Sequence, residues 1–416
     1  MAPPPHEIVI LGANFGGIGV THYLLRHVVP ALNILNSTQT YHVTLVGPSD
    51  HIFFKIGAPR ALLPDSAPIG TIPFEKIFLP IASEFKHYPP SQFTFHQGKA
   101  VSLDQTTHFV NIQNTDGSTS SLHYDSLVIA TGIKQSPIWS LVDDYTVSKE
   151  ALASLRQAIP KAKTILIAGG GPAGVETAGE IASAFPKKQI TLLSGNDRVL
   201  PRLKPATSND AQNHLKSLRV TVINNVRVSS TSPETPDFST PTTVTLDDGT
   251  TKTVDIYIDA TGGKPNSEFL PGSWLDSITK RVLTDPTGLR VHNGGSKDGL
   301  GEVVPGVYAI GDVASYGNAT AIDISNSVVP VSRSIAIDIA AKVGGLNGKK
   351  ASGKVFQPKP WVSWSTSMFV SIGPKGGVGQ MKGLKMPNFA VWALKARNLM
   401  LPMAEATIKG SSFVKP

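Results

Sequence analysis

The sequence predicts an α/β fold with two Rossmann-like units, and two observations predict it. An apolar strand at 7–11 runs into the glycine turn GANFGG at 12–17, and residues with helical spacing follow. A second apolar strand at 163–168 runs into GGGPAG at 169–174, which has the full GxGxxG spacing, and a second helix follows. In such a unit the helix N-terminus points free N–H groups at a pyrophosphate above the sheet. Two units in one chain therefore indicate two bound dinucleotides.

Composition places the chain among ordinary globular proteins. Its 416 residues include 40% hydrophobic and 16% charged residues, which is enough core for two or three domains and unlike a disordered or coiled-coil chain. No apolar run approaches the roughly 18 to 20 residues of a membrane span. The net charge of +8 suits anionic cofactors or an acidic membrane surface and does not by itself indicate nucleic acid, so no nucleic-acid partner is expected.

The chain has no Cys. Disulfides, thiolate metal sites, Fe–S clusters and electron relays through a protein dithiol are all excluded, and no metal site is predicted. No signal-peptide core or Arg-rich transit peptide precedes the first strand, so a cytoplasmic location is expected.

Three further strands end at residues that suit a bound dinucleotide. Two of them end in Ala-Thr-Gly, at 130–132 and 260–262, and the third ends in Gly311-Asp312. There the glycine lets the backbone approach a ligand, and Asp312 can accept hydrogen bonds from a polyol chain. Two nucleotides in one redox protein usually mean a flavin with a nicotinamide.

These motifs, in this order from residue 8 to about 345, resemble the two-dinucleotide-binding flavoproteins of the pyridine nucleotide-disulfide oxidoreductase superfamily. The resemblance is to the branch of apoptosis-inducing-factor-like proteins, ferroptosis suppressor protein and type II NADH dehydrogenases. It implies an FAD domain formed by 1–135 and 264–355, an NAD(P)H domain at 136–263 inserted into it, and a small α+β C-terminal portion at 356–416. It also implies FAD and either NADH or NADPH as cofactors.

Hydrophobic patterns predict elements within this frame. In the inserted domain, strands are expected at 190–193, 220–223 and 244–246, a helix at 205–218 and a loop at 229–241. In the C-terminal portion, the glycine-rich stretch 369–380 predicts a hairpin and 387–399 a helix. A further helix is expected from Asn326, with Pro330 near its first turn. By the resemblance, this helix starts beneath the flavin pyrimidine, where its dipole would stabilise negative charge.

The predicted cofactor residues follow from the motifs and the resemblance. For FAD they are Gly12, Asn14, Phe15, Gly16, Gly17, Lys55, Arg60, Ala130, Thr131, Gly132, Gly311, Asp312, Val329 and Pro330. For NAD(P)H they are Gly169, Gly171, Pro172, Ala173, Gly174, Glu176, Ser194, Arg198, Thr261 and Gly262.

Two strand ends depart from the usual pattern. The acid that holds the adenosine ribose is missing after Val46, so either Asp50 substitutes or Ser49 and the backbone hold the ribose. The corresponding strand of the second unit ends at Ser194 with Arg198 close behind. With no carboxylate to repel a 2′-phosphate, this end permits NADPH, although Arg198 is equally consistent with an ordinary surface residue.

By resemblance, three residues are predicted to be catalytic: Glu176, Lys55 and Lys395. Glu176 would lie between nicotinamide and flavin and pair with Lys55, unless it only complements the helix dipole in the first turn. Lys395 would reach toward the flavin and the acceptor, unless it is a solvated helix lysine. Arg60 is either a cofactor contact or part of a structural ion pair.

The absence of thiols rules out a disulfide reductase and leaves three functions. An NAD(P)H:quinone oxidoreductase fits best, because a quinone accepts electrons directly from reduced flavin in a flat apolar slot. The alternatives are an FAD-dependent oxidase or tailoring enzyme acting on one small metabolite, and a cofactor-stabilised signalling protein. Residues 387–409 either contact a membrane surface or pack on the FAD domain, and the oligomeric state is left open. The aromatic residues available for the slot are Phe53, Phe54, Trp361, Trp364, Phe369 and Trp392.

Overall fold

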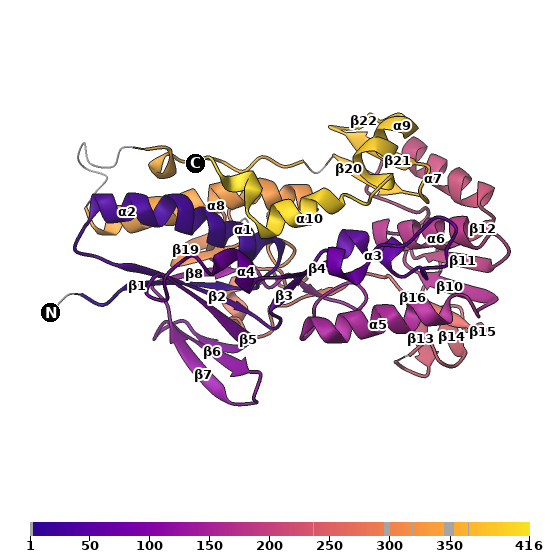
Figure 1. Cartoon of the computed structure of the whole chain (residues 1–416), viewed down its shortest axis with the longest axis horizontal. Coiled ribbons are helices and arrows are strands. Elements are labelled where there is room, and N and C mark those ends of the chain that lie inside the picture. The colour runs from indigo at the N-terminus through magenta and orange to yellow at the C-terminus, as the bar shows by residue number, and fades with distance from the viewer. Residues whose placement is uncertain (1–2, 236, 295–299, 318–319, 345–352, 365) are drawn as a thin grey trace.

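A computed structural model describes the chain except for residues 1–2, 236, 295–299, 318–319, 345–352 and 365. Of these excepted residues, 1–2, 295–299, 318–319 and 345–352 fall within the predicted FAD domain. The chain is an α/β protein in which a large and a small sheet lie at opposite ends, and the C-terminal segment runs along both (Figure 1).

The large sheet has eight strands in the order β18-β19-β8-β1-β2-β5-β6-β7. Its centre is parallel, since β1 pairs with β2 and β8, β2 with β5, and β8 with β19. Its edges are antiparallel. The strands are β1 (His6–Leu11), β2 (Tyr41–Gly47), β5 (Phe93–Asp104), β6 (Phe109–Asn114), β7 (Thr119–His123), β8 (Ser126–Ile129), β18 (Arg290–Gly294) and β19 (Leu300–Ala309).

Helices cover one face of this sheet. They are α1 (Phe15–Tyr23), which continues through a π-helical turn η1 (Leu24–Val28) into α2 (Val29–Leu35), and α8 (Ala321–Lys342). Because Gly19 has no side chain, α1 approaches α8 closely: an added Cβ would lie 2.7 Å from the Val328 side chain. Helix α8 begins at Ala321 after the cap Thr320, so the predicted start at Asn326 is wrong and Pro330 lies inside the helix.

The small sheet is fully parallel, in the order β12-β11-β10-β16. Its strands and the helices around it are β10 (Thr164–Ala168), β11 (Gln189–Ser194), β12 (Val220–Asn224), β16 (Ile256–Asp259), α5 (Tyr145–Ala158), α6 (Pro172–Ala184) and α7 (Pro205–Ser217). The predicted strands at 190–193 and 220–223 and the helix at 205–218 are confirmed.

A three-stranded antiparallel sheet flanks the small sheet: β13 (Val228–Ser232), β14 (Thr242–Leu246) and β15 (Thr251–Val254). It confirms the strand at 244–246. The loop prediction is wrong at 229–232, because this Ser/Thr-rich segment finds a partner in β14 that its own pattern did not reveal.

The chain passes twice between the two sheets, at β9 (Ile133–Lys134) and β17 (Lys264–Pro265), which pair antiparallel. The strands of the small sheet all lie between these two passages. We therefore propose to keep the domain boundaries at 135/136 and 263/264.

The C-terminal portion consists of β20 (Met368–Ser371), β21 (Gly377–Met381), β22 (Leu384–Lys385), α9 (Asn388–Val391), a π-helical turn η7 (Trp392–Ala396) and α10 (Leu401–Ile408). The predicted hairpin is confirmed, since β20 and β21 pair antiparallel. It lies on α6, where an added Cβ at Gly179 would come within 3 Å of the backbone of Ile372 and Gly373. None of the helices among the described residues is long and apolar enough to cross a bilayer.

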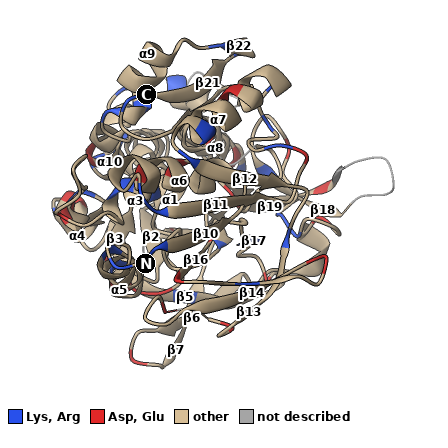
Figure 2. Ribbon diagram, turned by 90° about the vertical axis from the view of Figure 1, so that its right-hand side faces the viewer, with Lys and Arg blue, Asp and Glu red and all other residues tan. Residues whose placement is uncertain are grey.

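The remaining described elements are short: β3 (His51–Phe53), β4 (Phe78–Pro80), η2 (Lys55–Gly57), α3 (Ala58–Ala61), η3 (Phe74–Lys76), α4 (Ala82–Phe85), η4 (Gly272–Trp274), η6 (Lys354–Phe356) and η8 (Ser411–Phe413). Lys and Arg are interspersed with Asp and Glu over the elements (Figure 2).

Candidate functional site

The first glycine turn joins β1 to α1. Gly12 has φ +115°, and an added Cβ would collide with the carbonyl of Ala130 at the end of β8. An added Cβ at Gly17 would collide with the carbonyl of Gly12, so the helix also packs directly on the turn. Only glycine allows both contacts. The turn therefore brings the N-terminus of α1 to the carboxyl ends of the parallel strands, where dinucleotides bind in such sheets.

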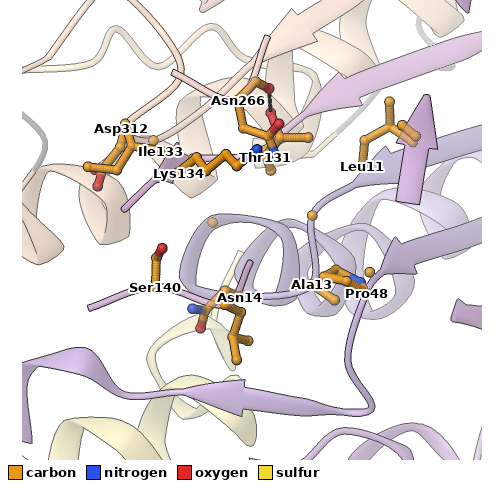
Figure 3. A pocket seen from close by; sticks show the side chains of 18 of the residues that line it. Leu11, Ala13, Asn14, Pro48, Thr131, Ile133, Lys134, Ser140, Asn266 and Asp312 are labelled. Atoms are coloured by element: carbon orange, nitrogen blue, oxygen red, sulfur yellow. Dashed lines mark hydrogen bonds between the residues drawn. The ribbon is translucent and has the colours of Figure 1, made fainter. Parts of the chain in front are cut away.

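A cavity of about 470 Å³ opens over this turn. The predicted FAD residues at its wall are Gly12, Asn14, Phe15, Gly16, Lys55, Ala130, Thr131, Gly132, Gly311 and Asp312. Figure 3 shows Asn14 and Asp312 with Thr131, whose Oγ1 donates to the Asn266 carbonyl at 2.6 Å.

Two oxygen atoms at the cavity wall lack a hydrogen-bond partner. They are Oδ1 of Asn14 and Oδ1 of Asp312, both buried. Asn14 uses its amide NH₂ to donate to the Phe53 carbonyl at 3.2 Å, and the other oxygen of Asp312 lies 3.2 Å from Lys55 Nζ. Buried acceptors of this kind need donors. The hydroxyl and ring N–H groups of FAD would supply them, so the residues present fit the cofactor.

Ser49 and the segment 46–48 also line the cavity. Ser49 Oγ accepts from the N–H groups of His51 and Tyr145, each at 3.1 Å. Asp50 contacts His51 instead, with Oδ1 2.6 Å from Nδ1, and its side chain is half exposed. Further wall residues that the sequence motifs did not indicate are Gly98–Val101, Lys134, Ser140–Val142, Asn266 and Glu268.

The second glycine turn repeats the geometry of the first. Gly169 has φ +119°, and an added Cβ would collide with the Ala260 carbonyl; one at Gly174 would collide with the Gly169 carbonyl. Helix α6 begins at Pro172, next to Ala173, and an added Cβ at Gly171 would meet open space. Thr261 and Gly262 lie exposed at the end of β16. The two glycine turns therefore have the same geometry. We call each turn, with the N-terminus of the helix that follows it, a dinucleotide cradle: the first at 12–17 and the second at 169–174.

The end of β11 differs from the prediction. Ser194 is fully buried, and its Oγ donates to the Arg198 carbonyl at 2.9 Å, so its hydroxyl closes the turn and is not available to a ligand. Arg198 pairs with its neighbour Asp197 at 2.9 Å. Arg227, which the sequence reading missed, lies across Gly195 and donates to its carbonyl at 3.0 Å.

The predicted Lys55–Glu176 ion pair is wrong. Lys55 pairs with Asp312, whereas Glu176 Oε1 lies 2.6 Å from Lys395 Nζ. Glu176 also accepts from Ser371 N at 3.1 Å, and Lys395 donates to the Phe369 carbonyl at 3.0 Å. Both side chains are buried, so Lys395 is not a solvated lysine. Glu176 lies in the second turn of α6, not in the first turn, where a carboxylate would complement the helix dipole. Its ion pair with Lys395 explains the carboxylate at this position.

Arg60 lies away from the cavity wall, in a buried ion pair with Glu180. Nε and Nη2 donate to the two carboxylate oxygens at 2.8 and 2.6 Å. Burial raises the pKa of Glu180, and Arg60 opposes that rise. The cofactor contact predicted for Arg60 is therefore wrong, and the structural alternative holds.

Val329 and Pro330 are also misplaced in the prediction. Because α8 begins at Ala321, both residues lie in its third turn and pack in the core. Ile324, in the first turn, lines the cavity instead. The Asn-Ser pattern before Pro330 suggested a helix start, but Thr320 is the residue that caps the helix, accepting from Asp323 N at 3.1 Å.

The six aromatic residues proposed for an apolar slot do not all line the cavity. Phe53 lines the cavity, whereas Phe54 is buried in the core and Trp361 packs edge-on against Tyr316. Trp392 is 42% exposed.

Comparisons with known proteins agree with this architecture. The family model for pyridine nucleotide-disulphide oxidoreductases matches residues 6–335. Oxidoreductase phnG of Penicillium herquei is 34% identical over 432 residues, covering 100% of this chain and 98% of that protein. Human ferroptosis suppressor protein 1 is 25% identical over 411 residues, covering 97% and 96%. NDH2 of Plasmodium falciparum, solved with NADH, has a TM-score of 0.63 at 16% identity, covering 99% and 100%.

The family match, the two cradles and the unsatisfied acceptors together identify the cofactors as FAD and NAD(P)H. The protein is a flavin-dependent NAD(P)H oxidoreductase that has no redox cysteines. It belongs to the pyridine nucleotide-disulphide oxidoreductase family.

Proposed function

We propose that the protein passes electrons from NAD(P)H through FAD to a quinone-type acceptor. The observation that carries the proposal is the pairing of two dinucleotide cradles with a chain that has no Cys. Without a thiol relay in this chain, the acceptor takes electrons directly from the flavin. A quinone does so, and the flavoprotein branch that the sequence resembles includes proteins with a quinone site near the flavin.

We propose that Gly12, Asn14, Phe15, Gly16 and Asp312 hold FAD at the first cradle, and that Gly169, Gly171 and Gly174 hold NAD(P)H at the second. Bound FAD supplies a centre that accepts hydride from the nicotinamide and releases electrons to the acceptor. Lys55 forms an ion pair with Asp312 at the cavity wall.

The Glu176–Lys395 pair is the proposed charge-stabilising group of the site. Its members come from the first helix of the second cradle and from the C-terminal portion, and both are buried. A buried cation held by two acceptors does not reorganise during turnover, which makes it effective at stabilising negative charge that develops in a reaction.

NADPH is the proposed preferred nucleotide. Arg198 and Arg227 flank the end of β11, and the neighbouring Asp197 is already paired with Arg198. An arginine near this strand end accommodates a 2′-phosphate. Arg227 carries no carboxylate partner among the described residues and is exposed.

A peripheral membrane contact is proposed for the C-terminal portion. Its large apolar side chains Leu384, Phe389, Trp392 and Leu394 are 73%, 74%, 42% and 46% exposed. Lys385 and Arg397 lie among them, a composition that suits an acidic bilayer surface. Flotation with acidic vesicles at low salt tests the contact: the protein should float with the vesicles, and a protein that stays at the bottom contradicts it.

A second function is favoured by the identities. The chain is 34% and 31% identical to two fungal oxidoreductases, phnG and ptaL, but 24–25% identical to ferroptosis suppressor protein 1. Both names say oxidoreductase and neither names a quinone, so oxidation or reduction of one specific small metabolite, the alternative predicted from the sequence, is the second candidate.

One steady-state screen separates the two candidates. NADH and NADPH oxidation is measured with dioxygen alone and after adding ubiquinone analogues. The proposal predicts strong stimulation by the quinones. Slow oxidation that no quinone stimulates would contradict it and favour the specific-metabolite enzyme.

A further inference from the structure

Arg60 joins three parts of the molecule. It lies in α3, beside the cavity residue Lys55, and its guanidinium forms the two-pronged contact with Glu180 on α6. The same guanidinium donates to two carbonyls of the C-terminal portion, from Nη2 to Ala396 at 2.7 Å and from Nη1 to Arg397 at 3.1 Å. Both Arg60 and Glu180 are buried.

The two carbonyls lie where a helix ends. The π-helical turn η7 finishes at Ala396, and Leu399 and Met400 then take left-handed backbone angles, φ 49° and 59°, before α10 begins. Carbonyls in the last turn of a helix receive no hydrogen bond from an N–H group within the helix, so they need a donor from elsewhere. Arg60 supplies that donor from another domain.

The residue just before these carbonyls is Lys395. Its ammonium is held by Glu176 and by the Phe369 carbonyl. Glu176 and Glu180 are four residues apart on α6 and so lie on one face of the helix. One helix face thus fixes Lys395 twice: Glu176 holds its side-chain end directly, and Glu180, through Arg60, holds the main chain that follows it.

We propose that Arg60 is a positioning residue that sets the place of Lys395 against Glu176. The inference rests on the proposed role of Lys395 in turnover. Geometry explains why the position needs Arg: a lysine has a single point charge and cannot contact both oxygens of Glu180 and two carbonyls from one planar group.

A purely structural clamp is the alternative, because loss of one member of any buried ion pair destabilises a protein. The two ideas differ in what happens to Lys395 in a protein that still folds and holds FAD. If Arg60 positions Lys395, its replacement frees that ammonium. If Arg60 only clamps the domains, the ammonium stays paired with Glu176.

The test compares FAD-loaded Arg60→Lys and Arg60→Met with Arg156→Met. Arg156 is a matched control, since it also donates to main-chain carbonyls, at Ala61 and Ile72, but neither carbonyl belongs to the C-terminal portion. The first readout is the rate at which an amine-acetylating reagent modifies Lys395, measured by mass spectrometry and normalised to exposed Lys264. The second readout is kcat and KM for NAD(P)H.

In both Arg60 variants we expect Lys395 acetylation to rise several-fold and kcat to fall about tenfold, with KM for NAD(P)H unchanged, as for a displaced functional group. Arg156→Met should change neither. Unchanged acetylation in a folded Arg60→Lys protein would overturn the proposal even where Arg60→Met does not fold. Raised acetylation with unchanged kcat would uphold the positioning and instead contradict the role of Lys395 in turnover.

Discussion

The Lys395 ammonium is buried and contacts two acceptors from different parts of the fold, the Glu176 carboxylate and the Phe369 carbonyl. Such a side chain is expensive to bury unless both acceptors are present. Without the ammonium, Glu176 keeps the hydrogen bond from the Ser371 N–H.

Lys395→Met should therefore lower kcat by about 10²-fold while FAD stays bound, because it removes the cation of the proposed charge-stabilising pair. Steady-state kinetics and the FAD content of the purified variant measure the two effects. Lys382→Met, in the same C-terminal portion but placed over the Trp364 ring, is the control and should keep wild-type kcat. Equal kcat in both variants would remove Lys395 from the mechanism.

Arg227 gives a separate prediction about nucleotide choice. Arg227→Ala should weaken NADPH binding about tenfold, the range expected for a hydrogen bond to a charged group, and leave NADH binding nearly unchanged. Calorimetric titration of the FAD-loaded protein with each nucleotide measures both constants. An equal loss for NADH and NADPH would show that Arg227 does not read the 2′-phosphate.

At the scale of elements, each strand–glycine–helix unit was predictable because its chemistry is local. Gly12 and Gly169 have positive φ and lie close to a carbonyl, and only glycine tolerates both. The strand, glycine and helix signals that indicate such a turn follow one another directly in the sequence. The partners of Lys55, Glu176 and Arg60 were not predictable, because each pairs across more than 100 residues of sequence. The start of α8 was missed for a local reason: Pro330 resembles a helix-start signal, but the Thr320 cap lies ten residues earlier.

The second cradle gives a direct test of element function. An added Cβ at Gly171 meets open space, so Gly171→Trp should fold and keep FAD while its indole fills the place of the nucleotide. NAD(P)H titration should then show little or no binding. Gly272→Trp is the control, since Gly272 is equally free of neighbours but lies in η4. If NAD(P)H affinity survives in Gly171→Trp, the assignment of this cradle is wrong.

Helix α1 holds the C-terminal segment through His22, whose Nε2–H donates to the Ile408 carbonyl at 2.8 Å. Burial lowers the pKa of His22 from 6.5 to about 4. Between these values the unfolded chain binds a proton that the folded chain does not. The free energy of unfolding therefore falls as pH drops from 6.5 toward 4, by about 3 kcal/mol from this group.

His22→Gln should remove that part of the pH dependence. Urea unfolding of the two proteins at pH 7 and pH 4 gives the difference. Arg26→Gln is a suitable control, because Arg26 donates to the Gly410 and Lys409 carbonyls of the same segment but has no imidazole. Parallel pH profiles for wild type and His22→Gln would contradict a neutral, buried His22.

At the scale of the whole molecule, the C-terminal portion ties the two nucleotide domains together. Its hairpin packs on α6 of the small-sheet domain, while α10 and the segment after it are held by α1 of the large-sheet domain. The sequence predicted the two domains because each is a repeated motif. It left the route of residues 387–409 open between membrane and protein, because their apolar residues follow no single pattern: Ala404 and Ile408 are buried, whereas Phe389 is exposed.

One chain holds FAD and NAD(P)H here, and electrons pass between them without a thiol. The decisive experiment is anaerobic mixing of the purified protein with NADPH or NADH, with the flavin absorbance followed in time. We expect a yellow protein whose flavin band bleaches on mixing and returns when a quinone is added. A colourless protein that takes up no FAD, or a bound flavin that stays oxidised with both nucleotides, would contradict it.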